Sequence, residues 1–247
     1  MTMNSVKTAL RVLEAVAAQQ PAGLSDLARR LGLPKSTVQR CLATLDEAGW
    51  IRPGGQELTR WVVTGRAFSV GSQVANTRNL REIALPALSA LQEATLETIH
   101  LMVPDGDEMV LIERLDSAYE LRTFKPLGSR APLHATSNGK AVLAHLPEDE
   151  REAYLAARLK PVTANTLTDP DELRARLAEI RARGYAINVE EMHDGVTSVG
   201  AAILDGGRPA ASLSISGPSS RITPDKHTDY GTRVTTAAHH ITTTLTG

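Results

Sequence analysis

Cysteine is almost absent from this chain of 247 residues, in which Cys41 is the single thiol. One thiol forms no internal disulfide and cannot build a zinc site from several thiolates. No stretch approaches the roughly 20 consecutive apolar residues of a membrane helix. Charged side chains interrupt the apolar pattern of the N-terminal segment, whereas a signal peptide has an uninterrupted apolar region. We therefore expect a cytoplasmic protein with no membrane partner.

Aromatic residues make up only 3% of the chain, which argues against an aromatic cage for a cationic ligand. The glycine motifs of nucleotide sites and the G-x-S-x-G motif of hydrolases do not occur. Ser137 and Lys140 do form an S-x-x-K pair, but its partner motifs S-D-N and K-T-G are missing. His193 with Glu190 and Glu191 could in principle hold a metal, although a loop of solvated charges is favoured. We expect no cofactor, no metal site and no enzymatic activity.

The net charge of −1 hides an asymmetry along the chain. Residues 1–78 hold 10 Lys and Arg against 5 Asp and Glu, whereas residues 79–247 hold 17 against 23. A basic end on an acidic body suggests two domains, with an anionic partner for the first. A chance imbalance is the alternative explanation of an excess this small.

The basic end has the pattern of three short helices followed by a hairpin. Apolar residues at helical spacing predict helices over 5–19, from Ser25 to Leu31, and over 35–48, and Ser25 is a suitable N-cap. Trp50–Arg52 and residues 57–63 then predict two strands joined by a turn at 53–56. This order is the plan of a winged helix-turn-helix. The polar residues 64–78 predict a connecting helix or linker, and in the helical pattern of 79–97 Pro86 marks a kink or a new start.

The acidic body alternates between strands and helices, which indicates an α+β fold with a mainly antiparallel sheet. Strands are expected at 98–103, 108–114, 119–124, 185–189, 197–204 and 209–216. Helices are expected at 137–146, 148–158, 170–183 and 224–245.

In a helix-turn-helix the second helix of the pair, here 35–48, lies in the major groove. Arg pairs bidentately with guanine and Gln with adenine, whereas Lys, Ser and Thr suit phosphates. Two cations and no acid lie between Lys35 and Thr44, which favours DNA over the alternative of a protein-interaction module. The candidate DNA-binding residues are Ser25, Lys35, Ser36, Thr37, Gln39, Arg40, Thr44, Arg52 and Arg60.

Four segments resemble the isocitrate lyase regulator (IclR) family in the right order. Leu33–Arg40 is similar to its helix-turn-helix, and Pro132–Ala144, with the letters PLHATSNGKAVLA, is similar to its "plHa…GKalLA" segment. The blocks from Arg183 to Val196 and from Ala211 to Pro218 match later parts of the family pattern. The resemblance covers almost the whole chain.

This resemblance implies a DNA-binding transcriptional regulator, a repressor or an activator, whose operator affinity a small-molecule effector changes. It divides the chain into a winged helix-turn-helix (1–64), a linker helix (65–78) and a GAF- and PAS-like effector-binding and oligomerisation domain (79–247). It implies a homodimer or a dimer of dimers on a pseudopalindromic operator in double-stranded DNA. The alternative is a small-molecule binding or enzymatic domain with a winged helix used for protein contacts.

We expect Ser137 or Asn138 to cap helix 137–146, whose free N–H groups then suit an anion. In carboxylate-binding relatives this stretch looks like the part that holds the carboxylate, so a carboxylate effector is expected. The alternative is that both residues are only caps. An apolar floor is expected from strands that carry Leu101, Val103 and Leu111. The candidate effector-binding residues are Leu121, Leu133 at the mouth, His134, Ser137, Asn138, Asn188 and Ser198.

Overall fold

The computed structural model describes residues 3–54, 60–71, 75–122, 124–157 and 159–246. The chain divides into two units, Met1–Ala75 and Asn76–Gly247. Each has its own buried apolar core, so each unit is described by itself.

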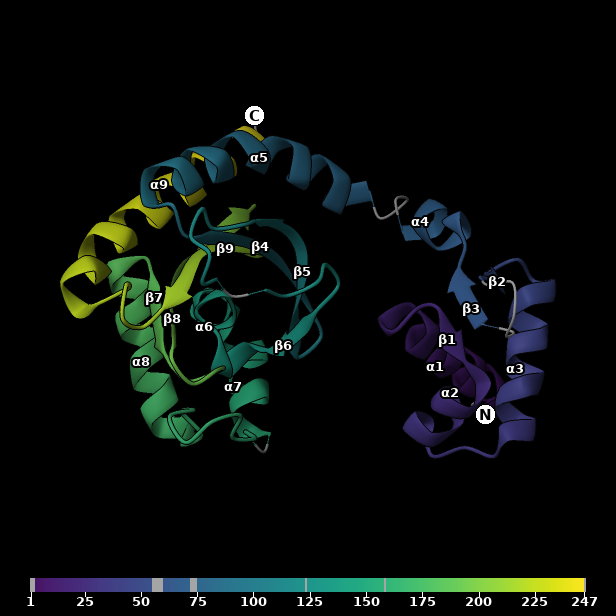
Figure 1. Cartoon of the computed structure of the whole chain (residues 1–247). Helices are drawn as coiled ribbons and strands as arrows, with labels where there is room; N and C mark the ends of the chain where they lie inside the picture. Colours follow the sequence, from purple (N-terminus) through teal and green to yellow (C-terminus); the bar gives the residue numbers. More distant parts are fainter. Residues whose placement is uncertain (1–2, 55–59, 72–74, 123, 158, 247) are drawn as a thin grey trace. The chain divides into compact units, whose positions relative to one another are not determined.

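The N-terminal unit packs three helices against a three-stranded antiparallel sheet of order β1-β3-β2 (Figure 1). Its elements are α1 (Asn4–Ala18), β1 (Ala22–Gly23), α2 (Leu24–Leu31), α3 (Lys35–Glu47), β2 (Ile51–Pro53), β3 (Arg60–Val63) and α4 (Gly65–Gly71). Val16, Leu27, Val38 and Leu42, whose helical spacing predicted the three helices, are buried in the core. Val6 and Leu10 of the same pattern are instead 51% and 53% exposed, whereas Val12 is buried. The helix-turn-helix order is confirmed. Residues 55–59, which include part of the predicted hairpin, lie outside the described residues.

The predicted N-cap of the second helix is wrong. Gly23 occupies the N-cap position of α2 and Ser25 lies in the first turn, exposed. The physical reason is strand β1, which the sequence did not predict. Because Ala22 and Gly23 pair with β3, the extended backbone continues to Gly23 and α2 starts directly after it. At the other end, the left-handed Gly32 (φ +65°) ends the helix as expected.

The segment between the units contains two helices, where the sequence predicted a connecting helix or linker and then a helix with a kink or a new start at Pro86. α4 is followed by α5 (Ala75–Thr95), a single helix that continues through Pro86. Leu80, Ala84, Leu88 and Leu91 of α5 are buried in the core of the C-terminal unit. Most of α5 therefore belongs to the fold of that unit.

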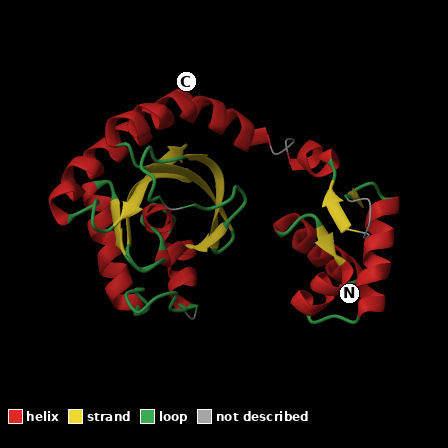
Figure 2. Cartoon of the chain, viewed as in Figure 1, coloured by secondary structure: helices red, strands yellow, loops and turns green. Residues whose placement is uncertain are grey.

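The C-terminal unit is built on a six-stranded antiparallel sheet of order β6-β5-β4-β9-β8-β7. Figure 2 shows its strands in yellow with helices on both sides, and in Figure 1 the sheet curls around α6. The strands are β4 (Thr98–Asp105), β5 (Glu108–Leu115), β6 (Arg130–Pro132), β7 (Ala186–Val189), β8 (Val196–Asp205) and β9 (Arg208–Pro218). The helices are α6 (Ser137–Leu143), α7 (Glu148–Ala156), α8 (Pro170–Arg183) and α9 (His227–Thr246), with short 3-10 turns η1 (Leu133–Ala135) and η2 (Pro224–Lys226). The predicted α+β fold is confirmed.

The two faces of this sheet have different chemistry. One face packs Ile99, Leu101, Leu213 and Ile215 against α5 and α9. The opposite face lies against α6 and carries the residues that alternate with these four along β4 and β9, such as His100 and Ser214. Because side chains alternate along a strand, Leu101 and Val103 fall on the α5 and α9 side. Their predicted place in an effector pocket is therefore wrong.

The prediction of a strand at 119–124 is also wrong, because the described residues of this segment form a loop. The strand that pairs with the outer side of β5 is β6. Two arginines hold the described part of this segment as a loop. The Arg221 guanidinium lies 4.4 Å from the ring centre of Tyr119, and that of Arg114 lies 4.0 Å from the ring centre of Phe124. Both aromatic residues of this segment thus make cation–π contacts.

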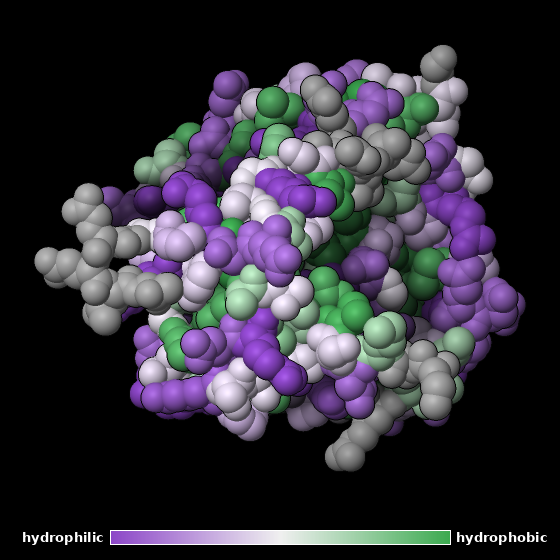
Figure 3. Space-filling model, turned by 90° about the vertical axis from the view of Figure 1, so that its right-hand side faces the viewer, coloured by the Kyte–Doolittle hydropathy of each residue, from purple (hydrophilic) through white to green (hydrophobic). Residues whose placement is uncertain are grey.

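Hydrophilic side chains predominate on the face shown in Figure 3, with apolar side chains in smaller patches between them. Among the described residues, no helix combines the length and the apolar character that crossing a membrane requires.

Candidate functional site

The exposed side of α3 carries most of the predicted DNA contacts. Lys35, Ser36, Gln39 and Arg40 are exposed, whereas Val38, Leu42 and Leu45 hold the other side of the helix in the core. No acidic residue interrupts this surface before Asp46. A rigid helix therefore presents two cations and an amide together, the groups that read base edges and phosphates.

Most of the remaining candidates of this unit are partly buried or already hydrogen-bonded within the protein. Thr37 is half-buried, and Thr44, although exposed, donates its hydroxyl to the Arg40 carbonyl at 3.0 Å. Arg52 is exposed on β2. Arg60 donates to the Pro21 carbonyl at 3.3 Å, which fastens the start of β3 to the α1–α2 turn.

A cavity lies in the C-terminal unit between the polar face of the sheet and α6. Its lining residues are His100, Met102, Leu111, Lys125, Ala131, Thr136, Asn138, Asn188, Met192, His193, Val196, Ser198, Ser214 and Ser216. The cavity volume is about 50 Å³, whereas a single water needs roughly 10–15 Å³. The cavity therefore suits a ligand of few heavy atoms.

Strand pairing explains why polar groups gather there. Ser198 of β8 lies opposite Asn188 of β7 and Ser216 of β9, and Ser214 of β9 lies opposite His100 of β4. Paired residues share a face of the sheet, so these side chains form two adjacent polar rows. Buried polar groups need hydrogen-bond partners. Among the described residues, however, His100 Nε2 and Ser214 Oγ have none.

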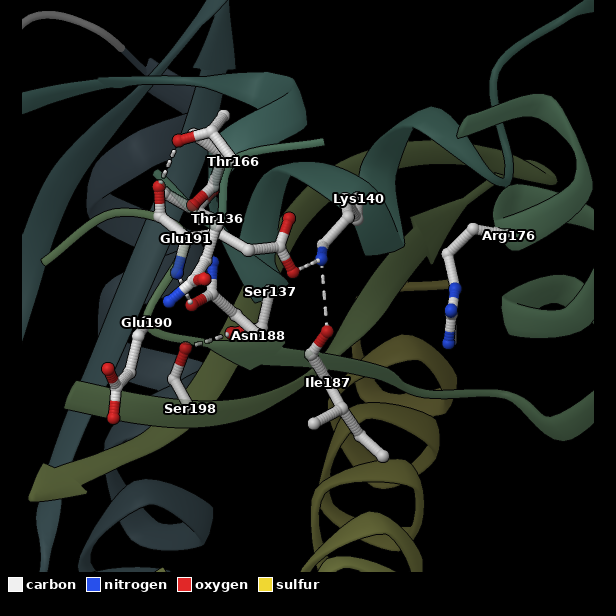
Figure 4. Close-up of polar contacts among 12 residues, drawn as sticks. Thr136, Ser137, Lys140, Thr166, Arg176, Ile187, Asn188, Glu190, Glu191 and Ser198 are labelled. Atoms are coloured by element: carbon white, nitrogen blue, oxygen red, sulfur yellow. Dashed lines mark hydrogen bonds and ion pairs between the residues drawn. The ribbon is translucent and has the colours of Figure 1, made fainter. Parts of the chain in front are cut away.

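Helix α6 closes the cavity from above, but its cap differs from the prediction. The N-cap is Thr136, whose hydroxyl accepts from the Gly139 N–H at 2.9 Å. Ser137 Oγ lies 2.8 Å from Ser198 Oγ (Figure 4). The Asn138 amide donates to Ser212 Oγ at 3.0 Å. The helix starts one residue earlier than a Ser137 cap requires, so both predicted cap residues point into the sheet instead.

Four predicted pocket residues are therefore close together: Ser137, Asn138, Asn188 and Ser198. The other three lie elsewhere. Leu133 is buried in the core below α6, and Leu121 is 70% exposed in the loop after β5. His134 Nδ1 lies 2.7 Å from the Tyr154 hydroxyl and its Nε2 lies 3.0 Å from the Lys160 carbonyl. The 3-10 turn η1 turns His134 toward α7 and away from the cavity.

Sequence reasoning missed several lining residues, of which His100, Lys125 and Ser214 are the most informative. The alternation Ser212-Leu213-Ser214-Ile215-Ser216 was a usable signal, because regularly spaced serines on an apolar strand mark a polar buried face. Lys125 gave no such signal, because its position depends on the loop that Arg114 holds by donating to the Lys125 carbonyl.

The charges in the cavity are unbalanced. Burial is the main cause that lowers the pKa of His100 to about 3, with Lys125 and Arg114 contributing, so this imidazole is neutral at physiological pH. Burial also lowers the pKa of Lys125. Among the described lining residues there is one lysine and no Asp or Glu. The cavity therefore presents positive charge and neutral hydrogen-bonding groups, which suits an anion.

Behind the cavity wall, the Lys140 ammonium is buried and donates to Glu191 Oε1 and to the Ile187 carbonyl, the latter at 3.0 Å (Figure 4). Since its amine binds these groups and not Ser137, the S-x-x-K pair has no nucleophile geometry. Glu191 is likewise not the solvated charge that the sequence suggested. Among the described residues, no group of three or more His, Cys, Asp or Glu side chains is placed to hold a metal.

Gly139 is the contact point between α6 and η1. A Cβ built there would run into the carbonyl oxygen and Cα of Leu133. We expect Gly139→Ala to destabilise the C-terminal unit by about 1–3 kcal/mol, the usual cost of overpacking. Chemical denaturation would measure this loss. The matched control is Gly65→Ala, where the added methyl meets open space, and equal stability of the two variants would contradict the close packing of α6.

These features define a class of protein: a winged helix-turn-helix joined to an α+β unit with a polar cavity. Comparison with known proteins gives the family. Residues 5–55 match the IclR helix-turn-helix domain, and residues 72–243 match the bacterial transcriptional regulator IclR C-terminal domain. The chain belongs to the IclR family of transcriptional regulators, which are DNA-binding proteins and not enzymes. The alternative of a winged helix used for protein contacts is not favoured.

Individual relatives agree with this assignment. The chain is 38% identical to the transcriptional repressor IclR of Escherichia coli over 97% of its own length and 89% of that protein. The Thermotoga maritima IclR structure has a TM-score of 0.78 and 32% identity, with 99% of each chain covered. An IclR homologue from Microbacterium hydrocarbonoxydans complexed with 4-hydroxybenzoate has a TM-score of 0.83 and 27% identity, with 98% of this chain and 99% of that chain covered.

Proposed function

We propose that this regulator binds its operator through α3 and changes its operator affinity when a small organic acid occupies the cavity below α6. The observation that carries the effector part is the lining of that cavity. It combines the charge of Lys125 with two buried polar atoms, His100 Nε2 and Ser214 Oγ, that have no partner among the described residues. Unpaired buried polar atoms cost free energy, and a polar ligand removes that cost.

In the DNA-binding role, Arg40 and Gln39 read bases while Lys35, Ser36 and the arginines of the wing contact phosphates. Ser25 of α2 and Thr37 and Thr44 of α3 make further contacts with the DNA backbone in this proposal. Two copies of the chain, or two pairs of copies, bind a pseudopalindromic operator in the cytoplasm, because a symmetric dimer fits symmetric half-sites.

In the effector role, the ligand's carboxylate pairs with Lys125, and a second polar group of the ligand meets His100 and Ser214. Asn138, Asn188 and Ser198 complete the polar wall, whereas Met102, Leu111 and Met192 cover the apolar part. Burial disfavours the charged form of Lys125 and so lowers its pKa. A bound carboxylate favours the charged form and offsets this effect. The seven-residue helix α6 is too short to supply that charge by itself.

Regulation requires that the acid bind one arrangement of the dimer better than the other, since a ligand with equal affinity shifts nothing. In this proposal residues 1–64 bind DNA, residues 79–247 bind the effector and form oligomer contacts, and the linker 65–78 transmits the change between them.

A thermal-shift screen of the full chain tests the effector role. The panel pairs acetate, lactate, benzoate and 4-hydroxybenzoate with their neutral amides. We expect at least one acid to raise the melting temperature, because a ligand at a hundred times its Kd stabilises by about 2.7 kcal/mol, and its amide to have no effect. Equal shifts from acid and amide, or no shift from any acid, would contradict a carboxylate effector.

A further inference from the structure

The buried ion pair between Lys140 and Glu191 joins two elements that are far apart in sequence. Lys140 lies on α6 with 2% of its side chain exposed, and Glu191 lies in the β7–β8 loop with 13% exposed. The same ammonium donates to the Ile187 carbonyl of β7 at 3.0 Å. Figure 4 shows Lys140 reaching from α6 to both groups. The pair therefore fixes the start of the loop 190–195 against the helix.

This loop is held in a conformation that it would not adopt alone. Glu190 has a left-handed backbone (φ +60°), which is unfavourable for a residue with a side chain. The hydroxyl of Thr163 donates to the Glu190 carbonyl and that of Thr166 to the Glu191 carbonyl, each at 2.7 Å. Asn188 accepts from the Glu191 N–H at 3.2 Å. Strained backbone persists where surrounding contacts over-determine it, so the loop depends on these attachments.

The loop also forms one wall of the cavity. Met192 and His193 of the loop, with Val196 at the start of β8, line this cavity and also a second pocket that Lys125 and Arg130 line. Lys140 and Glu191 do not line the cavity themselves. They join this wall to α6, the element that carries Asn138.

We propose that Lys140 and Glu191 are positioning residues that hold the wall formed by loop 190–195 in the shape that recognises the effector. The proposal rests on the effector role proposed above for this cavity. Burial lowers the pKa of Lys140, and Glu191 partly offsets that effect. A buried ion pair adds little net stability compared with apolar side chains of similar size. Its hydrogen bonds, however, require a particular geometry, and this requirement determines the position of the loop relative to α6.

The test is hydrogen exchange of the full chain without ligand, comparing wild type with Lys140→Met/Glu191→Met. The two methionines keep the volume and remove the directional contact. We expect a similar melting temperature, but amide exchange in 190–195 faster by about tenfold or more, the usual consequence of losing hydrogen bonds to charged groups. Exchange in α8 and β8 should not change. Unchanged exchange in 190–195 would overturn the proposal, and so would uniformly faster exchange with a lower melting temperature, which indicates a merely structural pair.

The matched control is Arg174→Met/Glu152→Met, which removes an ion pair between α8 and α7 with side chains 45% and 38% exposed. It should leave loop 190–195 unchanged. A second measurement titrates both double variants with lactate by calorimetry. Weaker lactate binding by about tenfold in the Lys140 and Glu191 variant alone supports the proposal, whereas equal affinity in both variants overturns it. If wild type binds neither lactate nor any other acid of the panel, the effector role fails, while the exchange comparison still decides whether the pair holds the loop.

Discussion

Arg40→Glu is expected to abolish specific operator binding. Arg40 lies on the exposed side of α3, one turn after the helix begins, where a recognition helix meets base edges. A lost bidentate contact costs about 1–3 kcal/mol, and a dimer carries the change twice. The new carboxylate is also repelled by phosphates. Together these effects predict a loss of affinity of at least about a hundredfold.

A mobility shift measures this loss on a duplex that the wild-type chain selects from random DNA. Arg181→Glu is the matched control, since it makes the same change of charge at an exposed position of α8. The control should bind like wild type, and wild-type binding should weaken steeply as salt rises. Wild-type affinity in Arg40→Glu would contradict the role of α3 as the reading helix. A wild-type chain that selects no DNA sequence would contradict operator recognition itself.

The sequence was informative wherever one face of an element is buried and the other is solvated. Helical spacing that includes Val16, Leu42 and Leu45 predicted α1 and α3, because these residues lie in the core against which the helices pack. β1 escaped prediction because a two-residue strand has no period. Its pairing with β3 also moved the start of α2, so the error at Ser25 has the same cause.

The errors in the C-terminal unit have a common physical origin. Periodicity says that a strand has two faces, but not which face meets which helix. Leu101 was therefore assigned to the cavity, although its neighbours His100 and Met102 are the residues that line it. Leu121 was assigned there on a strand predicted over 119–124, whereas the described residues of that segment form a loop in which Tyr119 and Phe124 contact arginines.

Side chains that depend on long-range contacts could not be predicted from local pattern. His134 follows the 3-10 turn η1 toward Tyr154. Lys140 meets Glu191, a residue 51 positions later in the chain. The family resemblance did bring Ser137, Asn138, Asn188 and Ser198 to one place, because it covers segments that the sheet brings together.

Lys125→Met is expected to weaken binding of the acid effector by about tenfold to a hundredfold, the usual contribution of a hydrogen bond to a charged group. Burial lowers the pKa of Lys125, so its charged form is penalised in the unliganded protein. At neutral pH the substitution removes that penalty, and the unliganded variant should be as stable as wild type or more stable. A bound carboxylate opposes the penalty and raises the pKa again. Loss of affinity without loss of stability is the expected result.

The pH dependence separates this role from a packing effect. Burial places the pKa of Lys125 below the ordinary lysine value. A carboxylate binds best below this pKa, where the amine is charged. Wild-type affinity should therefore fall as the pH rises through the pKa of Lys125. His100 stays neutral over that range and adds no change, because its pKa of about 3 lies far below it. Calorimetry of wild type from neutral to alkaline pH should show this fall, and Lys125→Met should show weak binding with none. Lys160→Met, at an exposed position outside the cavity lining, should bind like wild type. An alkaline fall that persists in Lys125→Met would assign the recognition of the carboxylate to another group.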